Sequence, residues 1–512
     1  AEIKRAQVDG MPGFPVYTRK VHTDASYLVC AQKLLASTAV IYPQFATHNA
    51  QTLSAIQVWA QAAGIDDYEF QCLHGMGETL YDQVVGPAGL DKPCRIYAPV
   101  GSHETLLAYL VRRLLENGAN SSFVNQIVDE AISIDTLVAD PFAIARQTGG
   151  VAHPNIALPA DLFGLERRNS AGIDLSDESV LREIDAAFAL QAMQPKHAAP
   201  LLQGAVSARD SHAVCNPANH HDVVGHVIDA DLQDVGSALA AAKAYAMDWQ
   251  TMPPADRAQL LMRGADLLEQ NRLELMALAV REAGKSLPNA IAEVREAVDF
   301  MRYYAAQVSD ELNALALGPV VCISPWNFPL AIFIGEISAA LAAGNVVLAK
   351  PAEQTPLIAY RAVQLLHQAG IPRGALQLLP GRGDTVGAAL VADRRVRGVI
   401  FTGSTDVAQL INRVLAKRAV VEGAEIALIA ETGGQNALIV DSSALPEQVV
   451  QDVISSAFDS AGQRCSALRV LCLQTDIADK TLVMLHGAMA ELNIGNPDRL
   501  ATDVGPVIDA DA

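Results

Sequence analysis

The segment 455–471, SSAFDSAGQRCSALRVL, places Cys465 between a run of small residues and an apolar run. A cysteine at such a junction is suited to presenting a thiolate nucleophile at a buried turn. A lone cysteine is more often an inert buried side chain, so the surrounding sequence has to decide between the two interpretations.

Polar residues upstream favour the nucleophile. They are a Trp-Asn turn, a Lys-Pro-Ala-Glu turn, a Gly-Ser turn after an apolar run, and a carboxylate followed closely by two glycines: Trp326-Asn327, 350–353, Gly403-Ser404 and Glu431. A thiol, a carboxylate and an amide donor are the groups that thioester chemistry needs for attack, hydrolysis and oxyanion stabilisation. The set indicates oxidation of an aldehyde through a thioester.

A second group of charged side chains lies on a predicted helix from about 103 to 117. Its leucines and Val111 fall on one side, and Arg112, Arg113 and Glu116 cluster opposite at about 100° per residue. A solvated charged face is the simpler interpretation of this pattern. The functional alternative is a pair of guanidinium groups that bind a carboxylate in bidentate fashion.

Composition bounds the class of protein. The chain has 512 residues, of which 51% are hydrophobic, so it is long enough for several domains with large cores. A net charge of -20 disfavours nonspecific nucleic-acid binding. We find no apolar run long enough for a membrane span and no secretory signal. Seven cysteines without CxxC spacing indicate reduced thiols in a cytoplasm, with neither a disulfide framework nor a metal site.

Strands and helices must position these residues, and in the first 130 residues they alternate. Four predicted strands lie at 14–20, 41–49, 70–78 and 95–101, and helices lie between or after them at 26–36, 52–64 and about 103–117. Alternation predicts parallel pairing, and polar residues follow the strands where a barrel places its site. Both a (β/α)8 barrel and an open doubly wound sheet fit this pattern.

The motifs FPVYTRK, YPQFATHNA, FQCLHGMGE, RIYAPVG and YLVRRLLENGANSSFVN, in this order over residues 1–130, closely resemble the second half of the proline dehydrogenase barrel of the bacterial bifunctional proline utilization (PutA) family. The resemblance implies binding of FAD by Arg19, Lys20, Thr47, His48, Asn49 and Glu116. It also implies a proline pocket made by Leu73, Tyr97, Arg112 and Arg113, which favours the functional interpretation of the arginine pair.

Taking a hydride from the carbon beside a secondary amine needs a tightly held flavin and a fixed substrate. The cyclic imine that results hydrolyses to glutamate semialdehyde. Only four of eight barrel strands are predicted, so we expect an internal fragment that binds flavin poorly by itself.

The segment 131–209 reads as a connector. Its part from 148 to 176 is rich in Gly, Pro, Asn and Ser, and Asp177 is placed to cap a helix that stops before Pro195. No chemical motif stands out there.

From about 210 onward the pattern predicts amphipathic helices at 256–284 and 289–308 and then buried strands. These lie at 319–330, 345–353, 375–381 and 396–404, with a crossover helix at 357–370. This is typical of a nucleotide-binding parallel sheet. There is no GxGxxG, and the Gly403-Ser404 turn is weak evidence for a phosphate site when taken alone.

The motifs PWNFPL, KPAEQTP, FTGS, ETGGQNA and GQRCSALRV, in this order, resemble the aldehyde dehydrogenase superfamily, and GQRCSALRV and AETGGQN match its 1-pyrroline-5-carboxylate dehydrogenase branch. The resemblance implies Cys465 as nucleophile, Glu431 as general base and Asn327 as oxyanion donor. It implies NAD binding by Lys350, Glu353, Gly403, Ser404 and Trp326, and substrate recognition by Ser466. Each residue alone has an ordinary structural interpretation, but the ordered set does not.

These inferences predict an α/β protein: a partial (β/α)8 barrel (1–130), a connector (131–209), a Rossmann-like NAD-binding domain (210–431) and the start of a catalytic domain (432–512). The expected activity is FAD-dependent oxidation of L-proline followed by NAD-dependent oxidation of glutamate semialdehyde. The resemblance further implies a membrane quinone as electron acceptor, peripheral contact with the inner membrane from the cytoplasm, and a homo-oligomer. An alternative of another class is a proline-responsive repressor whose DNA-binding module lies upstream of Ala1. Because the family has residues beyond both ends, we expect a chain truncated at each end.

Overall fold

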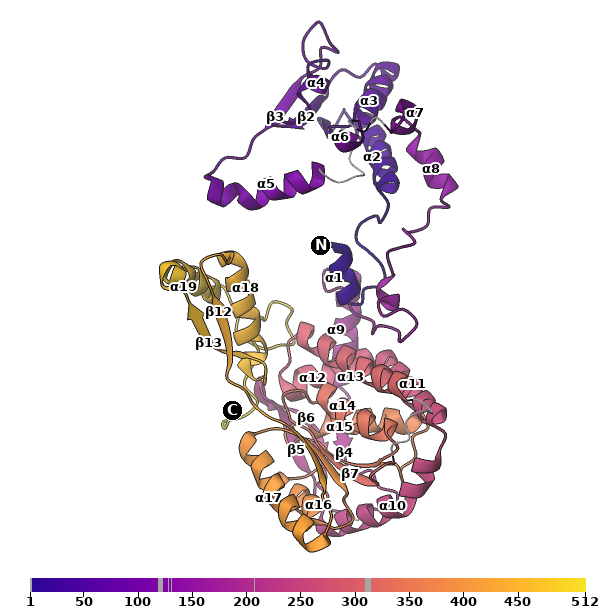
Figure 1. The fold of residues 1–512 in the computed structure, drawn as a ribbon, viewed down its shortest axis with the longest axis vertical. Helices are drawn as coiled ribbons and strands as arrows, with labels where there is room; N and C mark the ends of the chain where they lie inside the picture. Colours follow the sequence, from indigo (N-terminus) through magenta and orange to yellow (C-terminus); the bar gives the residue numbers. More distant parts are fainter. Residues whose placement is uncertain (1, 118–122, 128, 130, 207, 309–314) are drawn as a thin grey trace. The chain divides into compact units, whose positions relative to one another are not determined.

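The computed structural model describes residues 2–117, 123–127, 129, 131–206, 208–308 and 315–512. It divides into two compact units, one of residues 1–6 and 13–157 and the other of residues 7–12 and 158–512 (Figure 1). Among the described residues, no helix is long and apolar enough to cross a membrane. The short helix α1 (Glu2–Val8) begins the described chain.

The first unit is built on a parallel sheet of three strands in the order β1-β2-β3. Phe45 of β1 is paired in register with Phe70 of β2, and both are buried with Tyr68 and Ile56 in a separate core. Its elements are α2 (Lys20–Leu35), β1 (Gln44–Ala46), α3 (Ala50–Ala63), β2 (Glu69–Leu73), α4 (Glu78–Tyr81), β3 (Cys94–Tyr97), α5 (His103–Asn117), α6 (Phe123–Gln126), α7 (Ile134–Leu137) and α8 (Pro141–Gln147).

Local signals explain the ends of its helices. The side chain of Asn49 accepts hydrogen bonds from the backbone of Gln51 and Thr52 and so begins α3. Gly64 ends α3 with φ 67°, a conformation that glycine adopts without strain. The predicted helices at 52–64 and 103–117 are confirmed.

The predicted strand at 14–20 is wrong. The chain is irregular there until α2 begins at Lys20. A strand is stable only when a neighbour satisfies its backbone groups, and Pro15 lacks a backbone N–H. Arg19 instead donates from Nε to the carbonyl of Val151 at 3.0 Å, a long-range contact that local pattern does not reveal.

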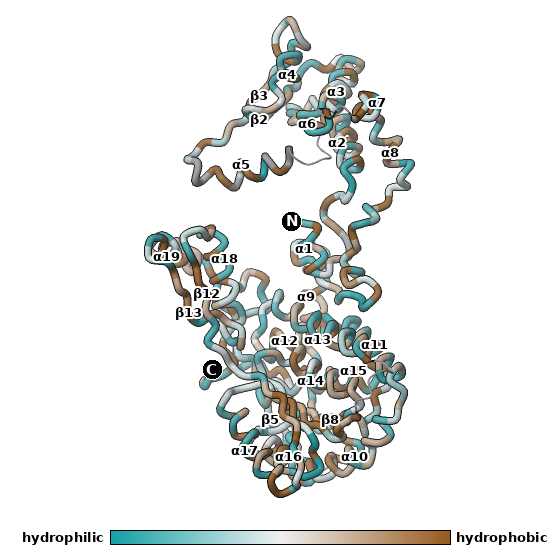
Figure 2. The backbone as a smooth tube through the Cα atoms, in the orientation of Figure 1, coloured by the Kyte–Doolittle hydropathy of each residue, from teal (hydrophilic) through white to brown (hydrophobic). Residues whose placement is uncertain are grey.

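The second unit centres on a parallel sheet of five strands in the order β11-β10-β7-β8-β9. Helices α10 and α16 pack on one side of it and α14 on the other (Figure 1). All five residues of β8 are buried, as expected for a parallel strand covered on both faces. The hydrophobic colouring of the tube near β8 follows this burial (Figure 2).

Two smaller sheets complete this unit: β4-β6-β5, and the parallel pair β12-β13. Its elements are α9 (Glu178–Ala192), β4 (Lys196–Ala198), β5 (His212–Asn216), β6 (Asn219–Val227), α10 (Leu232–Thr251), α11 (Pro254–Gln270), α12 (Arg272–Ala283), α13 (Leu287–Gln307), β7 (Pro319–Ile323), α14 (Ala331–Ala342), β8 (Val346–Lys350), α15 (Pro356–Gln368), β9 (Leu376–Leu378), α16 (Ala388–Ala392), β10 (Gly398–Thr402), α17 (Thr405–Glu422), β11 (Ala427–Glu431), β12 (Asn436–Val440), α18 (Pro446–Ala457), β13 (Leu468–Leu473) and α19 (Thr475–Ala490).

The strands predicted between 319 and 404 are confirmed, as are the Asp177 cap of α9 and the stop at Gly284. The single helix predicted at 256–284 is wrong, because α11 ends at Gln270 and α12 begins at Arg272. The intervening Asn271 leaves helical geometry, and its side-chain amide donates to the carbonyl of Leu267 at 2.8 Å. Asparagine favours such breaks because its side chain competes for backbone groups.

Candidate active site

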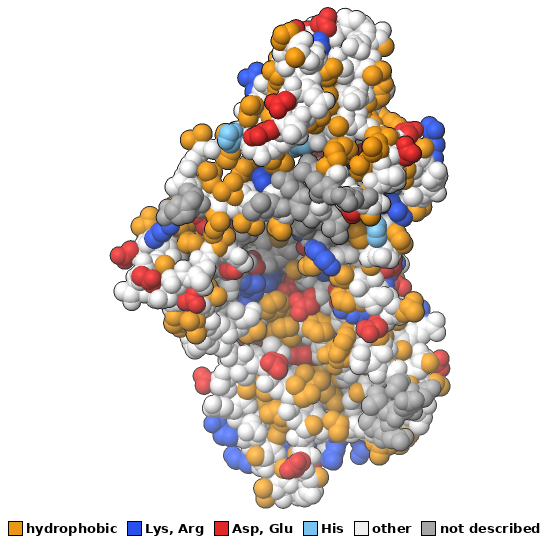
Figure 3. All heavy atoms as spheres, turned by 45° about the horizontal axis from the view of Figure 1, so that its top comes forward, with side chains coloured by type: hydrophobic (Ala, Val, Ile, Leu, Met, Phe, Trp, Pro, Cys, Tyr) orange, Lys and Arg blue, Asp and Glu red, His pale blue; other side chains and the backbone are white. Residues whose placement is uncertain are grey.

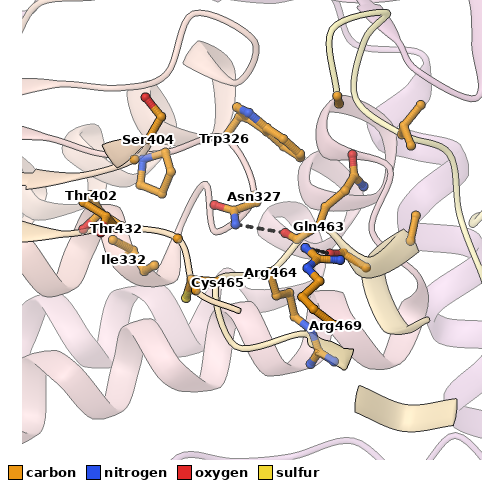
Figure 4. Close-up of a pocket in the computed structure, with 18 of the residues that line it drawn as sticks. Trp326, Asn327, Ile332, Thr402, Ser404, Thr432, Gln463, Arg464, Cys465 and Arg469 are labelled. Atoms are coloured by element: carbon orange, nitrogen blue, oxygen red, sulfur yellow. Dashed lines mark hydrogen bonds between the residues drawn. The ribbon is translucent and has the colours of Figure 1, made fainter. Parts of the chain in front are cut away.

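A pocket of about 550 Å³ opens at the carboxyl edge of the five-stranded sheet. It is lined by turns that follow β7, β10 and β11 and by the loop before β13, which carries Cys465. Ligands of open parallel sheets bind at this edge, because the turns after neighbouring strands converge there. Figure 4 shows Asn327 lying between Ser404 and the Gln463–Cys465 loop.

Asn327 joins two of these turns. Its side-chain Nδ2 donates to the carbonyl oxygen of Gln463 at 2.9 Å, across 136 residues of sequence (Figure 4). An amide nitrogen carries two protons, so the second is left for an acceptor in the pocket. The residue that would stabilise an oxyanion is therefore tied to the loop that would carry the nucleophile.

Cys465 is an exposed free thiol within the pocket lining. Its backbone carbonyl accepts a hydrogen bond from the Nδ2 of Asn436 at 2.7 Å. Asn436 lies in the ETGGQNA motif without a local signal for a role, and its contact across 29 residues is visible only in the structure. Asn436, the first residue of β12, thus contacts the cysteine itself, whereas Asn327 contacts Gln463 in the same loop.

The loop before Cys465 has an unusual backbone. Ser460 and Ala461 both have φ 55°, and Gly462 follows with φ 69°. Left-handed conformations in residues with a Cβ cost about 1–3 kcal/mol each and persist only where surrounding contacts hold them. Arg469 provides one such contact, donating from Nη2 to the carbonyl of Gly462 at 2.7 Å.

Glu431 is the last residue of β11 and is exposed. The next residues, Thr432 to Gly434, line the pocket, whereas Glu431 and Ser466 are outside its lining. The structure brings Cys465, Asn327, Trp326, Gly403 and Ser404 together around one cavity and puts the expected base beside it.

The turn between β10 and α17 fits a phosphate group. Ser404 caps α17 by accepting from the backbone N–H of Val407, and α17 is a helix of 18 residues whose first N–H groups face this edge. Gly403 cannot carry a side chain, since a Cβ there would lie 2.6 Å from the ring of Phe401. A close backbone approach at a helix start is what a dinucleotide diphosphate requires.

Lys350 ends β8 at the same edge of the sheet but outside the pocket lining. It is 4% exposed and donates from Nζ to the carbonyl of Pro351 at 2.8 Å. Burial lowers the pKa of this amine to about 8, and the nearby carboxylates of Glu353 and Asp229 oppose that shift. The pair of Lys350 and Glu353 fits a ribose, which takes a donor and an acceptor.

In the first unit, the residues after β1 and β2 come together. His48 accepts a hydrogen bond on Nε2 from the backbone N–H of Leu73 at 3.2 Å, and burial lowers the pKa of its imidazole. Thr47 accepts from the backbone N–H of Asn49 at 3.1 Å. With Nε2 accepting, Nδ1 of His48 carries the proton, so this strand-end cluster can donate to a flavin ring.

The other residues expected to bind FAD or proline in this unit have separate contacts of their own. Tyr97 ends β3 and is exposed, and Lys20 forms an ion pair with Asp24. Arg112 and Arg113 lie on α5, where the guanidinium of Arg113 stacks over the ring of Tyr109 at 5.3 Å. The side chain of Glu116 lies outside the described residues. The joint proline pocket and flavin site remain predictions.

Comparison with known proteins follows the division into two units. Residues 205–512 match the description "Aldehyde dehydrogenase family". The chain belongs to the aldehyde dehydrogenase family. Residues 1–126 match "Proline dehydrogenase", so a second family accounts for the barrel-like segment of this aldehyde dehydrogenase chain.

Relatives of this aldehyde dehydrogenase include the bifunctional protein PutA of Escherichia coli, 61% identical over 100% of this chain and 40% of that protein. The 1-pyrroline-5-carboxylate dehydrogenase of Anoxybacillus flavithermus is 40% identical over 61% of this chain and 64% of that protein. A crystal structure of bifunctional proline utilization A has a TM-score of 0.88 at 47% identity, covering 100% of this chain and 50% of that one. The chain thus spans about 40% of the length of the PutA of Escherichia coli.

Proposed function

We propose that the chain is part of a bifunctional enzyme of proline catabolism. The first activity is FAD-dependent oxidation of L-proline to 1-pyrroline-5-carboxylate, and the second is NAD-dependent oxidation of glutamate semialdehyde to glutamate. The observation that carries the proposal is the pocket in which Asn327 is hydrogen-bonded to the loop of Cys465. Similarity to PutA proteins, which are named as bifunctional, extends over the whole of this chain and supports the pairing of the two activities.

The domain boundaries form part of this proposal. Residues 1–130 are the second half of the proline dehydrogenase barrel and 131–209 the connector. Residues 210–431 bind NAD, which agrees with a sheet whose last strand, β11, ends at Glu431. Residues 432–512 begin the catalytic domain. Apolar side chains left exposed on β3 and α5, such as Ile96 at 62% and Leu107 at 60%, would pack against the remainder of a barrel.

In the semialdehyde reaction, the Cys465 thiolate attacks the aldehyde carbon to form a thiohemiacetal. The free amide proton of Asn327, together with a backbone N–H, stabilises the oxyanion. NAD, held by Lys350, Glu353, Trp326 and the Gly403-Ser404 turn, supplies a hydride acceptor when bound. Glu431 deprotonates a water that hydrolyses the thioester on Cys465, and the thiolate is restored.

In the proline reaction, Arg112 and Arg113 bind the substrate carboxylate, and Leu73 and Tyr97 enclose the ring. Arg19, Lys20, Thr47, His48, Asn49 and Glu116 hold FAD, which supplies a hydride acceptor for the carbon beside the amine when bound. Ser466, beside the nucleophile, contacts the semialdehyde.

We also propose a membrane quinone as final electron acceptor, cytoplasmic location with peripheral membrane contact, and a homo-oligomer. The repressor alternative is not proposed here, because it depends on a DNA-binding module outside residues 1–512, and the comparisons offer no observation that favours it.

The deciding experiment uses a chimera in which residues 1–512 replace the matching region of the Escherichia coli PutA, which supplies the flanking segments. We expect proline-dependent quinone reduction and semialdehyde-dependent NADH formation. Cys465→Ala should abolish NADH formation and leave proline oxidation intact, because only the thioester route needs the thiol. Cys472→Ala, on β13, is the matched control and should retain both activities. Undiminished NADH formation by the Cys465→Ala chimera would overturn the proposal.

A further inference from the structure

A buried ion pair lies beneath the pocket turns. Lys285 and Glu293 approach to 3.4 Å between Nζ and Oε1, and their side chains are 3% and 2% exposed. Lys285 follows the end of α12, and Glu293 lies in the second turn of α13. Neither residue lines the pocket or has a role in the chemistry described above. Burial of two charges is costly, so their other contacts indicate what the pair does.

Lys285 reaches the loop that carries Cys465. Its Nζ donates to the hydroxyl of Ser460 at 3.3 Å, across 175 residues of sequence. Ser460 is the first of the two consecutive residues with φ 55°. Lys285 therefore contacts the loop at a residue whose left-handed backbone conformation is unfavourable unless other contacts stabilise it.

The same pair reaches the turn that carries Asn327. The ammonium of Lys285 lies over the ring of Phe328, 4.8 Å from its centroid. Oε2 of Glu293 accepts hydrogen bonds from the backbone N–H groups of Leu330 at 3.2 Å and Ala331 at 3.0 Å, where α14 begins. A carboxylate at a helix start satisfies N–H groups that have no partner in the helix.

A second contact to the same loop comes from α13. Asn289 donates from Nδ2 to Asp459 at 2.6 Å, and Asp459 pairs with Arg464 at 3.1 Å. Residue 459 is thus tied to the residue just before Cys465. The loop is thus contacted at Ser460 by Lys285 and at Asp459 by Asn289 of α13, and Asp459 links this end of the loop to Arg464.

We propose that Lys285, paired with Glu293, is a positioning residue that fixes the Asn327 turn and the Cys465 loop relative to each other. The proposal rests on the proposed function, since the two turns matter together only if they act on one substrate. A buried charge pair suits this task because the low dielectric of the interior strengthens it and salt screens it only weakly. Displacing a reacting group by about 1 Å can cost on the order of 100-fold in rate.

The test is Lys285→Met in the chimera. We expect kcat for semialdehyde oxidation to fall at least about 10-fold, with the KM for NAD changed less than about twofold, because the nucleotide turn at Gly403 is untouched. Amide hydrogen exchange in 459–465 should accelerate at least about 10-fold. Lys196→Met is the matched control, since Lys196 forms a half-buried pair with Glu274 at 3.3 Å in the same unit, away from the loop.

A second variant separates positioning from simple stability. Lys285→Met leaves Glu293 as an unpaired buried charge, so Lys285→Met combined with Glu293→Gln should recover much of the melting temperature. The contact with Ser460 stays broken, so kcat should remain low and exchange in the loop fast. Recovery of kcat together with stability would overturn the proposal, as would a Lys285→Met chimera with normal kcat. If the Cys465→Ala chimera still forms NADH, the proposed function has failed instead.

Discussion

At the level of single residues, amide side chains in and beside the pocket form hydrogen bonds to the loop that carries Cys465. Asn327 donates one amide proton to the carbonyl of Gln463, which leaves the other for an acceptor in the pocket. Asn436 donates to the carbonyl of Cys465. Cys465, the proposed nucleophile, is exposed, and these amides contact the loop that carries it. Preorganised donors of this kind need no reorganisation when charge develops, which is why they are effective in catalysis.

Lys350 gives a prediction about pH and stability. Burial puts its pKa at about 8 in the folded chain, below the ordinary value near 10.5, so the folded state holds fewer protons than the unfolded state between these values. The free energy of unfolding contributed by this residue should therefore rise from about pH 8 to about pH 10.5. In Lys350→Met, this rise of about 2–4 kcal/mol should be absent when the free energy of unfolding is measured with denaturant from about pH 8 to about pH 10.5. Lys243→Met, at an exposed position on α10, serves as control, and parallel curves for Lys350→Met and the parent would contradict the prediction.

Arg112 gives a prediction about substrate affinity. If its guanidinium binds the carboxylate of proline, Arg112→Met should raise the proline KM of the chimera by about 2–5 kcal/mol in free-energy terms. Its steady-state rate with semialdehyde and NAD should stay unchanged, because the nucleophile belongs to the other compact unit. Arg146→Met, on α8, is a control within the same unit. An unaltered proline KM would remove Arg112 from the pocket.

At the level of elements, four of the predicted site residues lie at or just after the carboxyl ends of parallel strands. Asn327 follows β7, Lys350 ends β8, Gly403 follows β10 and Glu431 ends β11. Parallel pairing brings these ends to one edge, so residues about 100 positions apart come to share a site. Near this edge, Lys285, which follows α12, forms an ion pair with Glu293 of α13.

The turn at Gly403 gives a prediction about nucleotide binding. A Cβ at this position would meet the ring of Phe401 at 2.6 Å, and Phe401 is itself buried. Gly403→Ala should therefore shift the start of α17 and raise the KM for NAD about 10-fold or more, while a thiol reagent still reaches Cys465. Gly236→Ala on α10, where no atom lies within 4 Å of the added Cβ, should leave the KM unchanged. An equal KM for Gly403→Ala and Gly236→Ala would argue against a phosphate site at this turn.

At the scale of the whole molecule, the chain carries parts of two families in separate compact units with separate cores. The second unit buries the inner strands of its central sheet, such as β8, although Ile429 of the edge strand β11 is exposed, whereas the first unit leaves apolar side chains of β3 and α5 uncovered. In the space-filling view, orange side chains lie exposed among charged ones on this unit (Figure 3). This difference agrees with the proposal that residues outside this chain complete the barrel, and it predicts a lower free energy of unfolding for the first unit than for the second.

Most of the helices and strands could be predicted from the amino-acid sequence, because their signals are local. The buried run of β8, the Asn49 and Asp177 caps and the stops at Gly64 and Gly284 follow from hydrophobic period, side-chain capping and the left-handed freedom of glycine. The sequence also predicts Cys465 as a nucleophile, since the ordered motifs around it carry a resemblance that no single residue does.

The long-range contacts between site residues could be found only in the folded protein. The two members of the pair Asn327–Gln463 are 136 residues apart, and those of Lys285–Ser460 are 175 apart, so no local sequence pattern can predict either contact. The failed strand at 14–20 has the same cause, because a strand depends on a neighbour supplied by the fold. Cys465 was identifiable from its motif, but the lysine that supports its loop became visible only once α12, α13 and that loop were packed together.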